Sequence, residues 1–189
     1  MVISRLLMLG VICYAFHLRA DDDRYAAVSG DYQNHNYGYA LTIPGGLRGF
    51  KPKPPAPVHG IFIPLAEGQD ARIDVNANYN TLEYKSVPEA SAGENEWFVE
   101  RCVDSPRTLS KPATLGSIAA ISTEVRCMER GSRGSVVLDS IVAIGPAATD
   151  YMTAVVYSVS LISIDKRYLN DKKVYDRIVR SFKLTEAKR

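Results

Sequence analysis

Residues 71–79 alternate strictly between apolar and polar side chains, and this pattern limits the folds open to the chain. The apolar members are Ile73, Val75, Ala77 and Tyr79, and the polar members are Arg72, Asp74, Asn76 and Asn78. Successive side chains of an extended chain point to opposite faces, so the segment is expected to form a strand with one buried and one wet face. Such strands belong to antiparallel sheets more often than to parallel ones.

Five further segments are expected to form strands. Two short apolar stretches lie at 37–43 and 59–65, and three longer stretches lie at 117–128, 135–144 and 151–164. Short turns that contain glycine separate the last three, which predicts antiparallel neighbours. Residues 51–57, rich in proline, are expected to form an extended loop, because proline cannot donate a hydrogen bond to a sheet.

Two helices complete the expected fold. The first covers residues 88–102, where Pro88 suits a first helical turn. The second covers residues 171–184, where Val174, Ile178 and Phe182 recur at a spacing of four and would face the core. The sequence therefore predicts an α+β fold: a mostly antiparallel sheet of about six strands with helices packed on it.

The first twenty residues are typical of an export signal. Arg5 precedes an apolar run from Leu6 to Phe16, which is shorter than the roughly twenty residues that span a bilayer. Cleavage is expected after Ala15 or Ala20, and an uncleaved signal that anchors the chain is the alternative. A lipid on Cys13 is disfavoured, because the residue before it is not small. We expect residues 1–20 to be a signal peptide, 21–36 a flexible polar arm, and 37–189 one α+β domain.

Removal of the signal changes the charge of the chain. The full sequence has 23 basic and 21 acidic side chains, and both Arg5 and Arg19 leave with the signal, so the mature chain has 21 of each. Binding of nucleic acid depends on clustered Lys and Arg side chains that neutralise phosphates. A neutral mature chain therefore gives no reason to expect a nucleic-acid partner.

The export signal also determines how the cysteines are interpreted. Cys13 lies in the signal, so Cys102 and Cys127 remain as a pair in a chain sent to an oxidising compartment. We expect a disulfide between them, with two free buried thiols as the alternative. Pairing removes the thiolate that a catalytic cysteine needs, so thiol catalysis is disfavoured.

Two segments of the chain resemble the PsbP/Mog1-like α/β/α sandwich family, in its exported bacterial form. One is the opening strand at 37–44, which ends in Pro44. The other is the strand at 151–164 with the segment 174–184, whose ending Ile178-Val179-Arg180-Ser181-Phe182 recurs in exported members. The resemblance implies a sandwich domain that binds other proteins and lacks catalysis. A fold alone does not determine a function.

Few residues suggest chemistry. Only His35 and His59 remain after cleavage, and no compact set of His, Cys and acidic residues suggests a metal site or a cofactor. His59 precedes Gly60 and is the one weak candidate for a catalytic base, as in a small periplasmic hydrolase. Its alternative role is a hydrogen bond that fixes a loop, and no Gly-x-Ser-x-Gly motif supports a catalytic triad.

Two sets of polar and aromatic residues are candidates for binding. Asn76, Asn78 and Arg72, on the wet face of the alternating strand up to Asn80, suit a sugar or a peptide. Tyr37 and Tyr39 could add a recognition surface, since tyrosine contributes contact area at low entropic cost. The alternatives are a plain solvent-facing strand and packing of the N-terminal arm on the sheet.

The sequence thus favours a protein of the periplasm or the extracellular space that binds another envelope or secreted protein and is not an enzyme. An inhibitor or immunity-like protein and an accessory subunit of an envelope complex are both compatible with it. A hydrolase that uses His59 and a glycan- or peptide-binding module that uses Asn76–Asn80 are the alternatives. Cleavage of the signal would leave no stable membrane insertion.

Overall fold

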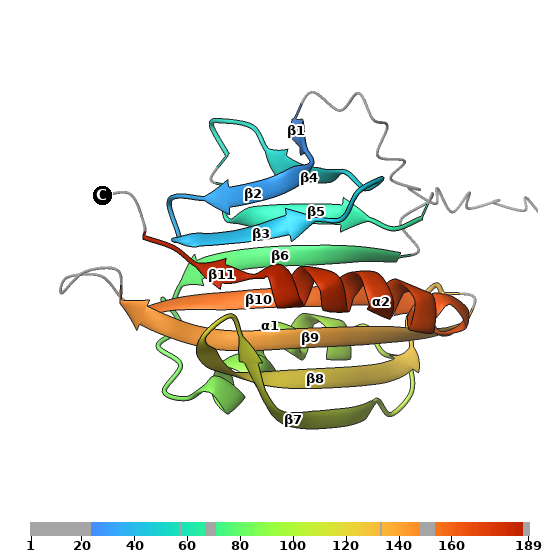
Figure 1. The fold of residues 1–189 in the computed structure, drawn as a ribbon. Coiled ribbons are helices and arrows are strands. Elements are labelled where there is room, and N and C mark those ends of the chain that lie inside the picture. The colour runs from blue at the N-terminus through green and yellow to red at the C-terminus, as the bar shows by residue number, and fades with distance from the viewer. Residues whose placement is uncertain (1–23, 57, 67–70, 133, 148–153, 187–189) are drawn as a thin grey trace, which may run out of the picture.

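The computed structural model describes residues 24–56, 58–66, 71–132, 134–147 and 154–186, so the expected signal peptide and its expected cleavage sites lie outside the described residues. Eight antiparallel strands form the main sheet, in the order β1-β4-β5-β6-β10-β9-β8-β7 (Figure 1). Their bounds are β1 Tyr25–Val28, β4 Gly49–Pro52, β5 Gly60–Pro64, β6 Ala71–Tyr79, β7 Arg107–Leu115, β8 Ile118–Met128, β9 Ser135–Ala147 and β10 Ala154–Ile164.

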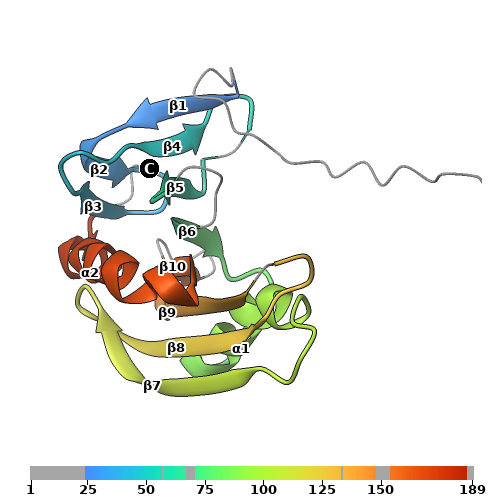
Figure 2. The ribbon, with the colours of Figure 1, turned by 90° about the vertical axis from the view of Figure 1, so that its right-hand side faces the viewer.

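A second, smaller sheet and two helices cover the main sheet. The second sheet has the order β11-β3-β2, with β2 Gly30–Asn34, β3 Tyr39–Ile43 and β11 Lys183–Leu184. Helix α2 (Asp165–Ser181) lies on the same side of the main sheet as this second sheet, and helix α1 (Val87–Val99) lies on the other side (Figure 2). The protein is therefore an α+β sandwich, as the sequence predicts.

The largest core cluster lies between the main sheet and the layer made by α2 and the second sheet. The apolar side of β6 faces this core, and Ile73, Val75 and Ala77 are completely buried. Tyr39 and Phe182 stack at the centre, with ring centroids 5.4 Å apart. The alternation of β6 is thus explained, because this side of the strand packs against a covering layer while the other side does not.

Residues 21–36, expected as a flexible polar arm, instead supply both β1 and β2. β1 pairs with β4, and β2 pairs with β3 from Gly30↔Ile43 to Asn34↔Tyr39. Tyr32 and Asn34 are buried, so alternate side chains of this polar stretch enter the core. The expectation was wrong because the polar composition of the segment suggested a flexible arm. Its strand character comes from pairing with β4 and β3, which a local pattern does not show.

Two further boundaries differ from the expectation. Helix α2 begins at Asp165, directly after β10, rather than at residue 171, because Tyr168 and Asp171 extend its buried stripe towards the N-terminus. It ends at Ser181, and Lys183 and Leu184 pair with β3 as a short strand. In the proline-rich stretch, Lys51 and Pro52 complete β4 rather than lying in a loop.

Gly60 allows β5 to approach β6 closely enough to pair with it in the main sheet. A Cβ atom on this residue would lie 1.7 Å from the carbonyl oxygen of Val75 on β6. No side chain fits in that space, so the sequence needs glycine here for the two strands to pair.

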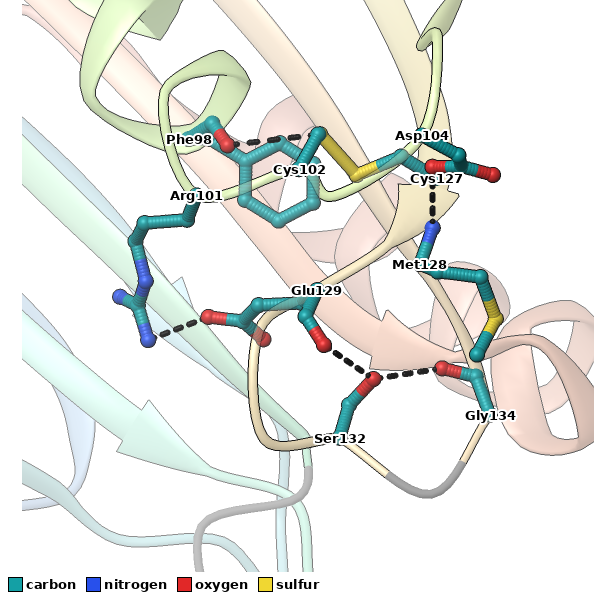
Figure 3. The surroundings of a disulfide bond; sticks show 9 residues. All are labelled: Phe98, Arg101, Cys102, Asp104, Cys127, Met128, Glu129, Ser132 and Gly134. Atoms are coloured by element: carbon teal, nitrogen blue, oxygen red, sulfur yellow. Dashed lines mark hydrogen bonds and ion pairs between the residues drawn. A yellow bond between two sulfur atoms is a disulfide. The ribbon is translucent and has the colours of Figure 1, made fainter.

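The structure joins Cys102 to Cys127, the pair that the sequence predicts (Figure 3). The bond connects the chain just after α1 to the end of β8, with 5.7 Å between the two Cα atoms. Neighbouring contacts hold the same two segments together: Arg101 forms an ion pair with Glu129, and Asp104 accepts from the Met128 amide at 2.8 Å. The C-terminal end of α1 is therefore fixed to β8. A disulfide indicates folding in an oxidising compartment.

None of the helices among the described residues is long and apolar enough to cross a membrane.

Candidate functional site

Helix α1 is positioned over β8 and β9. Ser86 caps its N-terminus by accepting from the Glu89 amide at 3.3 Å, and Pro88 lies in the first turn. Phe98 is 1% exposed and packs against Val125 and Leu138, and Ala90 packs against Val142. These contacts place the helix on the middle of this half of the sheet, so it does not extend over the edge strand β7.

Strand β7 is the open edge of the main sheet next to α1. It pairs only with β8 in the strand order, and its residues from Arg107 to Pro112 are all exposed. Leu109 is 67% exposed. Pro112 is tolerated because one side of an edge strand has no neighbouring strand, so the N–H that proline lacks would form no hydrogen bond within the sheet.

A groove of about 510 Å³ lies between α1 and β7 (α1–β7 groove; Figure 2 shows the position of α1). Its floor is formed by Ile121, Thr123 and Val125 of β8. Its helix wall contains Ser91, Ala92, Asn95, Glu96 and Val99, and its strand wall contains Thr108, Ser110, Lys111 and Pro112. The lining is mostly apolar with a few polar groups, which is the usual composition of a binding site.

The polar groups at the floor of the groove hold its two walls to β8. The Thr123 hydroxyl lies 3.0 Å from the Ser91 hydroxyl on α1 and 2.9 Å from the Ser110 hydroxyl on β7. This small network fixes the relative positions of helix, floor and edge strand, so the groove is pre-formed.

Asn95 is the one groove residue with an unsatisfied polar atom among the described residues. The side chain is only 5% exposed, and its Nδ2 atom has no hydrogen-bond partner there. Leaving a buried donor unpaired costs about 1–3 kcal/mol, so native proteins rarely keep one without a reason. A bound group with a hydrogen-bond acceptor would satisfy Asn95 only if the side chain turned towards the groove, because the Nδ2 atom is itself buried.

The helix wall of the groove is acidic. Within its bounds α1 carries Glu89, Glu94 and Glu96 and no Lys or Arg, and Glu96 lines the groove. Burial raises the pKa of Glu94. On the strand wall, Lys111 also lines the groove, between Ser110 and Pro112. The charges of the groove are therefore divided, with the acidic Glu96 on the helix wall and the basic Lys111 on the strand wall.

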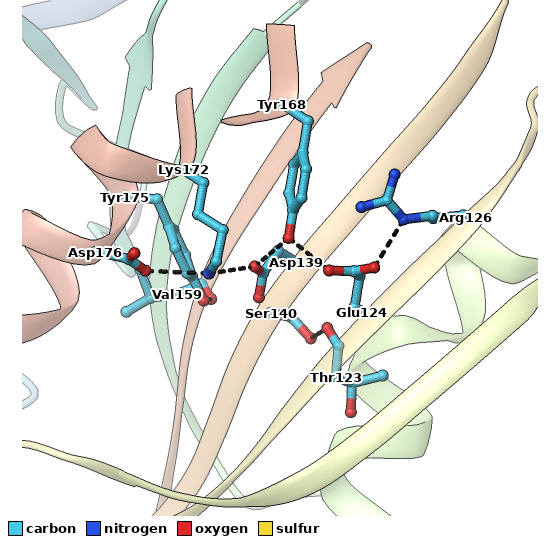
Figure 4. A network of polar contacts seen from close by, with 10 residues as sticks. All are labelled: Thr123, Glu124, Arg126, Asp139, Ser140, Val159, Tyr168, Lys172, Tyr175 and Asp176. Atoms are coloured by element: carbon cyan, nitrogen blue, oxygen red, sulfur yellow. Dashed lines mark hydrogen bonds and ion pairs between the residues drawn. The ribbon is translucent and has the colours of Figure 1, made fainter. Parts of the chain in front are cut away.

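A second polar cluster fixes α2 to the other face of the sheet (Figure 4). The Tyr168 hydroxyl lies 2.6 Å from Glu124 Oε2 and 2.9 Å from Asp139 Oδ2. Lys172 donates to Asp139 at 2.7 Å, so Lys172 does not simply face water. Asp139 is 2% exposed and thus pairs with a cation at the helix–sheet boundary. These contacts hold α2 against the sheet and fix its position along β8 and β9.

The same cluster shifts several pKa values. Burial, together with the neighbouring carboxylates, raises the pKa of Tyr168, so its hydroxyl stays protonated and can donate. Burial alone would raise the pKa of Glu124, but hydrogen bonds from Arg126 and Tyr168 lower it overall. Glu124 is therefore stabilised as a carboxylate in the folded protein.

His59 contacts an aromatic cluster just before β5. Its Nδ1 atom lies 2.8 Å from the Tyr37 hydroxyl, and its ring centroid lies 5.5 Å from that of Tyr37. Burial raises the pKa of Tyr37, so this hydroxyl remains protonated. The main chain nearby is also held, since Asn34 donates to the Val58 carbonyl at 3.0 Å. The contacts of His59 are those of a residue that fixes the segment leading into β5.

Asn76 and Asn78 lie on the side of β6 opposite the core, as the alternation predicts. Asn76 stands between Gly60 of β5 and Ser158 of β10 in the sheet register. On the same face, Arg72 donates to Asp74 at 2.9 Å, and burial raises the pKa of Asp74 although the Arg72 charge opposes the shift. The structure thus brings the predicted polar residues together on one half-exposed strand face.

Tyr37 and Tyr39 point into the protein rather than towards solvent. Tyr39 is 0% exposed, and Tyr37 is 8% exposed. The Tyr157 hydroxyl donates to the Tyr37 carbonyl at 2.7 Å. Both side chains contribute to the core, and neither offers a surface to a partner.

Sequence reasoning missed the α1–β7 groove altogether. Thr108, Ser110 and Pro112 alternate with other exposed residues, so no periodic contrast marked β7 as a strand. Asn95 in the middle of the predicted helix was the available signal, since a polar residue on the buried side of a helix needs a partner. Across the part of the chain that the structure describes, no group of His, Cys, Asp or Glu could hold a metal ion.

No protein-family model and no curated protein matches the sequence. Solved structures do match the fold. Cyanobacterial PsbP (CyanoP) from Synechocystis aligns with a TM-score of 0.51 and 13% identity, over 85% of this chain and 92% of that protein. LpqN of Mycobacterium tuberculosis, which is involved in cell envelope biogenesis, aligns with a TM-score of 0.51 and 10% identity, over 87% and 93%. The chain therefore has a PsbP-like fold, as its opening and closing segments suggest.

Proposed function

We propose that this protein is an exported, non-enzymatic accessory module that binds another protein of the cell envelope or the secreted fraction through its α1–β7 groove. The observation that carries the proposal is a pre-formed, mostly apolar groove beside an open sheet edge, with the unpaired Asn95 amide in its lining. Open edges invite association, and proteins normally cover or charge them.

Other features support an envelope location. The apolar N-terminal run is typical of a signal, and the disulfide between Cys102 and Cys127 suits the periplasm or the extracellular space. LpqN, one of the structural neighbours, takes part in cell envelope biogenesis. A neutral mature chain fits a protein partner better than nucleic acid.

Site-specific photo-crosslinking in the native host tests this proposal. A benzophenone amino acid replaces Thr108 in the groove, and in a separate strain it replaces Leu169, which is 75% exposed on α2 and far from the groove. We expect a discrete covalent adduct with one exported protein from position 108 and none from position 169. Adducts from position 169 alone, or no protein adduct from position 108, would contradict the proposal.

A further inference from the structure

We propose, on the basis of the proposed function, that the partner enters the α1–β7 groove as an extended segment that adds a strand to the free edge of β7. The proposal names the form of the partner: a peptide segment with apolar side chains at alternate positions and a basic side chain facing α1. It rests on the hydrogen-bonding pattern of β7, the shape of the groove and its charge.

The register of β7 shows which main-chain groups are free. Leu115 pairs with Ile118 across a turn of Gly116 and Ser117, and Gly116 has a φ of 58°. Residues that flank such a turn exchange both hydrogen bonds, and the pattern then alternates along the hairpin. The N–H and C=O groups that point away from β8 therefore belong to Thr108, Ser110, Pro112 and Thr114, except that Pro112 has no N–H.

The side chains of these outward-pairing residues line the groove. Thr108, Ser110 and Pro112 face α1, so a strand added beyond β7 would place every second side chain in the same space. Peptides bound by strand addition use this combination, in which main-chain hydrogen bonds give affinity and pockets for alternate side chains give specificity.

Charge and hydrogen bonding define the occupant further. Glu96 lines the helix wall, α1 carries no Lys or Arg, and the basic Lys111 lies on the strand wall, so a Lys or Arg of the partner segment would be attracted to the side that faces α1. If binding turned the Asn95 side chain towards the groove, its Nδ2 would donate to a carbonyl or side-chain oxygen of the segment. An extended peptide supplies such acceptors together with alternating apolar side chains.

Peptide display provides the probe. A library of random peptides of nine residues, the length of β7, is selected on the full mature protein with its disulfide intact. Selected peptides are synthesised and their affinity is measured by fluorescence polarisation. Each peptide is then remade with N-methyl groups on the odd or on the even amides, which removes the donors on one edge only. We expect one methylated set to lose affinity by about tenfold or more and the other to retain it.

Two protein variants form a matched pair. Ser110→Pro removes the outward N–H, whereas Ser110→Ala removes only the hydroxyl that contacts Thr123. We expect Ser110→Pro to weaken peptide binding by about tenfold, and Ser110→Ala, which loses the contact with Thr123 but keeps the N–H, to weaken it by a clearly smaller factor. Far-ultraviolet circular dichroism checks the fold of both, and the methylation experiment does not depend on either variant.

Three results would overturn the inference. Peptides insensitive to the position of N-methylation, or no selected peptide, would exclude strand addition. If crosslinking at position 108 still captured a protein, the proposed function would survive while this inference failed. A dimer in sedimentation that Ser110→Pro abolishes would assign the edge to a second copy of the chain instead.

Discussion

At the scale of single residues, the most informative group is the carboxylate of Glu124. It accepts from Arg126 at 2.7 Å and from the Tyr168 hydroxyl at 2.6 Å, and these bonds lower its pKa in the folded protein against the effect of burial. Because the pKa of Glu124 is lower in the folded protein than its ordinary value of 4.5, the carboxylate stabilises the folded state at pH values above 4.5. This stabilisation is lost as the pH falls through the lowered pKa.

Replacement Glu124→Gln should therefore destabilise the protein at about pH 7 and much less at an acidic pH below the lowered pKa, where the wild-type carboxylate is protonated. The free energy of unfolding by urea at the two pH values measures this difference. Glu83→Gln is the control, because Glu83 pairs with Lys85 only at 3.7 Å and both side chains are about 80% exposed. Equal destabilisation by Glu124→Gln at both pH values would contradict the assigned pKa shift.

Gly60 gives a second prediction at this scale. Gly60→Ala should destabilise the protein by about 2–3 kcal/mol, because the new methyl group would overlap the Val75 carbonyl and force β5 away from β6. Gly45→Ala is the matched control, since no atom lies within 4 Å of a Cβ there. The melting temperatures of the two variants are measured by thermal unfolding. Similar melting temperatures for Gly60→Ala and Gly45→Ala would contradict the prediction and show that β5 and β6 separate at this point with little loss of stability.

At the scale of secondary-structure elements, the disulfide determines where α1 ends relative to β8. Replacing both Cys102 and Cys127 by Ala should lower the free energy of unfolding by about 3 kcal/mol, because the bond closes a loop between positions 25 apart in sequence. Equilibrium urea unfolding measures the loss. A reducing agent should lower the stability of the wild type similarly and leave the double variant unchanged.

The double variant should also show faster amide exchange in the last turn of α1, where Phe98 and Val99 precede the disulfide. Exchange in α2 should be unaffected, because that helix is held by Tyr168 and Lys172. Unchanged exchange at the end of α1 would show that Phe98 packing alone positions the helix.

The elements differ in how well the sequence predicts them. β6 was predicted at its observed bounds, because one side of the strand is buried and the other is not. α1 and β8 were predicted within a few residues, α1 because Pro88 suits a first helical turn and β8 because it is a long stretch followed by a turn that contains glycine. β7 escaped prediction because nearly every side chain is exposed and Pro112 is uncommon in strands.

Long-range pairing accounts for the other differences. β1 and β2 are polar stretches whose strand character comes from pairing with β4 and β3. β11 forms only because Lys183 and Leu184 meet β3 after the chain leaves α2. Likewise, the α1–β7 groove exists because α1 does not extend over β7, and no local sequence pattern encodes that arrangement. The cysteine pair, by contrast, was predicted directly, because removal of the expected export signal leaves two cysteines.

At the scale of the whole molecule, the two faces of the main sheet have different roles. One face is covered by α2 and the second sheet and holds most of the core. The other face is covered only in part, by α1, which creates the α1–β7 groove at one end and leaves the Asn76 and Asn78 face at β6. The α1–β7 groove offers a cavity, an open sheet edge and an unpaired donor, and for this reason we propose it as the binding surface.

Hydrogen–deuterium exchange of the protein, free and bound to the partner captured from position 108, tests this account most directly. The account predicts slower exchange in β7, above all at the outward amides of Thr108, Ser110 and Thr114, and in the segment of α1 around Asn95. Slower exchange confined to β5 and β6 around Asn76, with β7 unchanged, would contradict it and assign binding to the open sheet face.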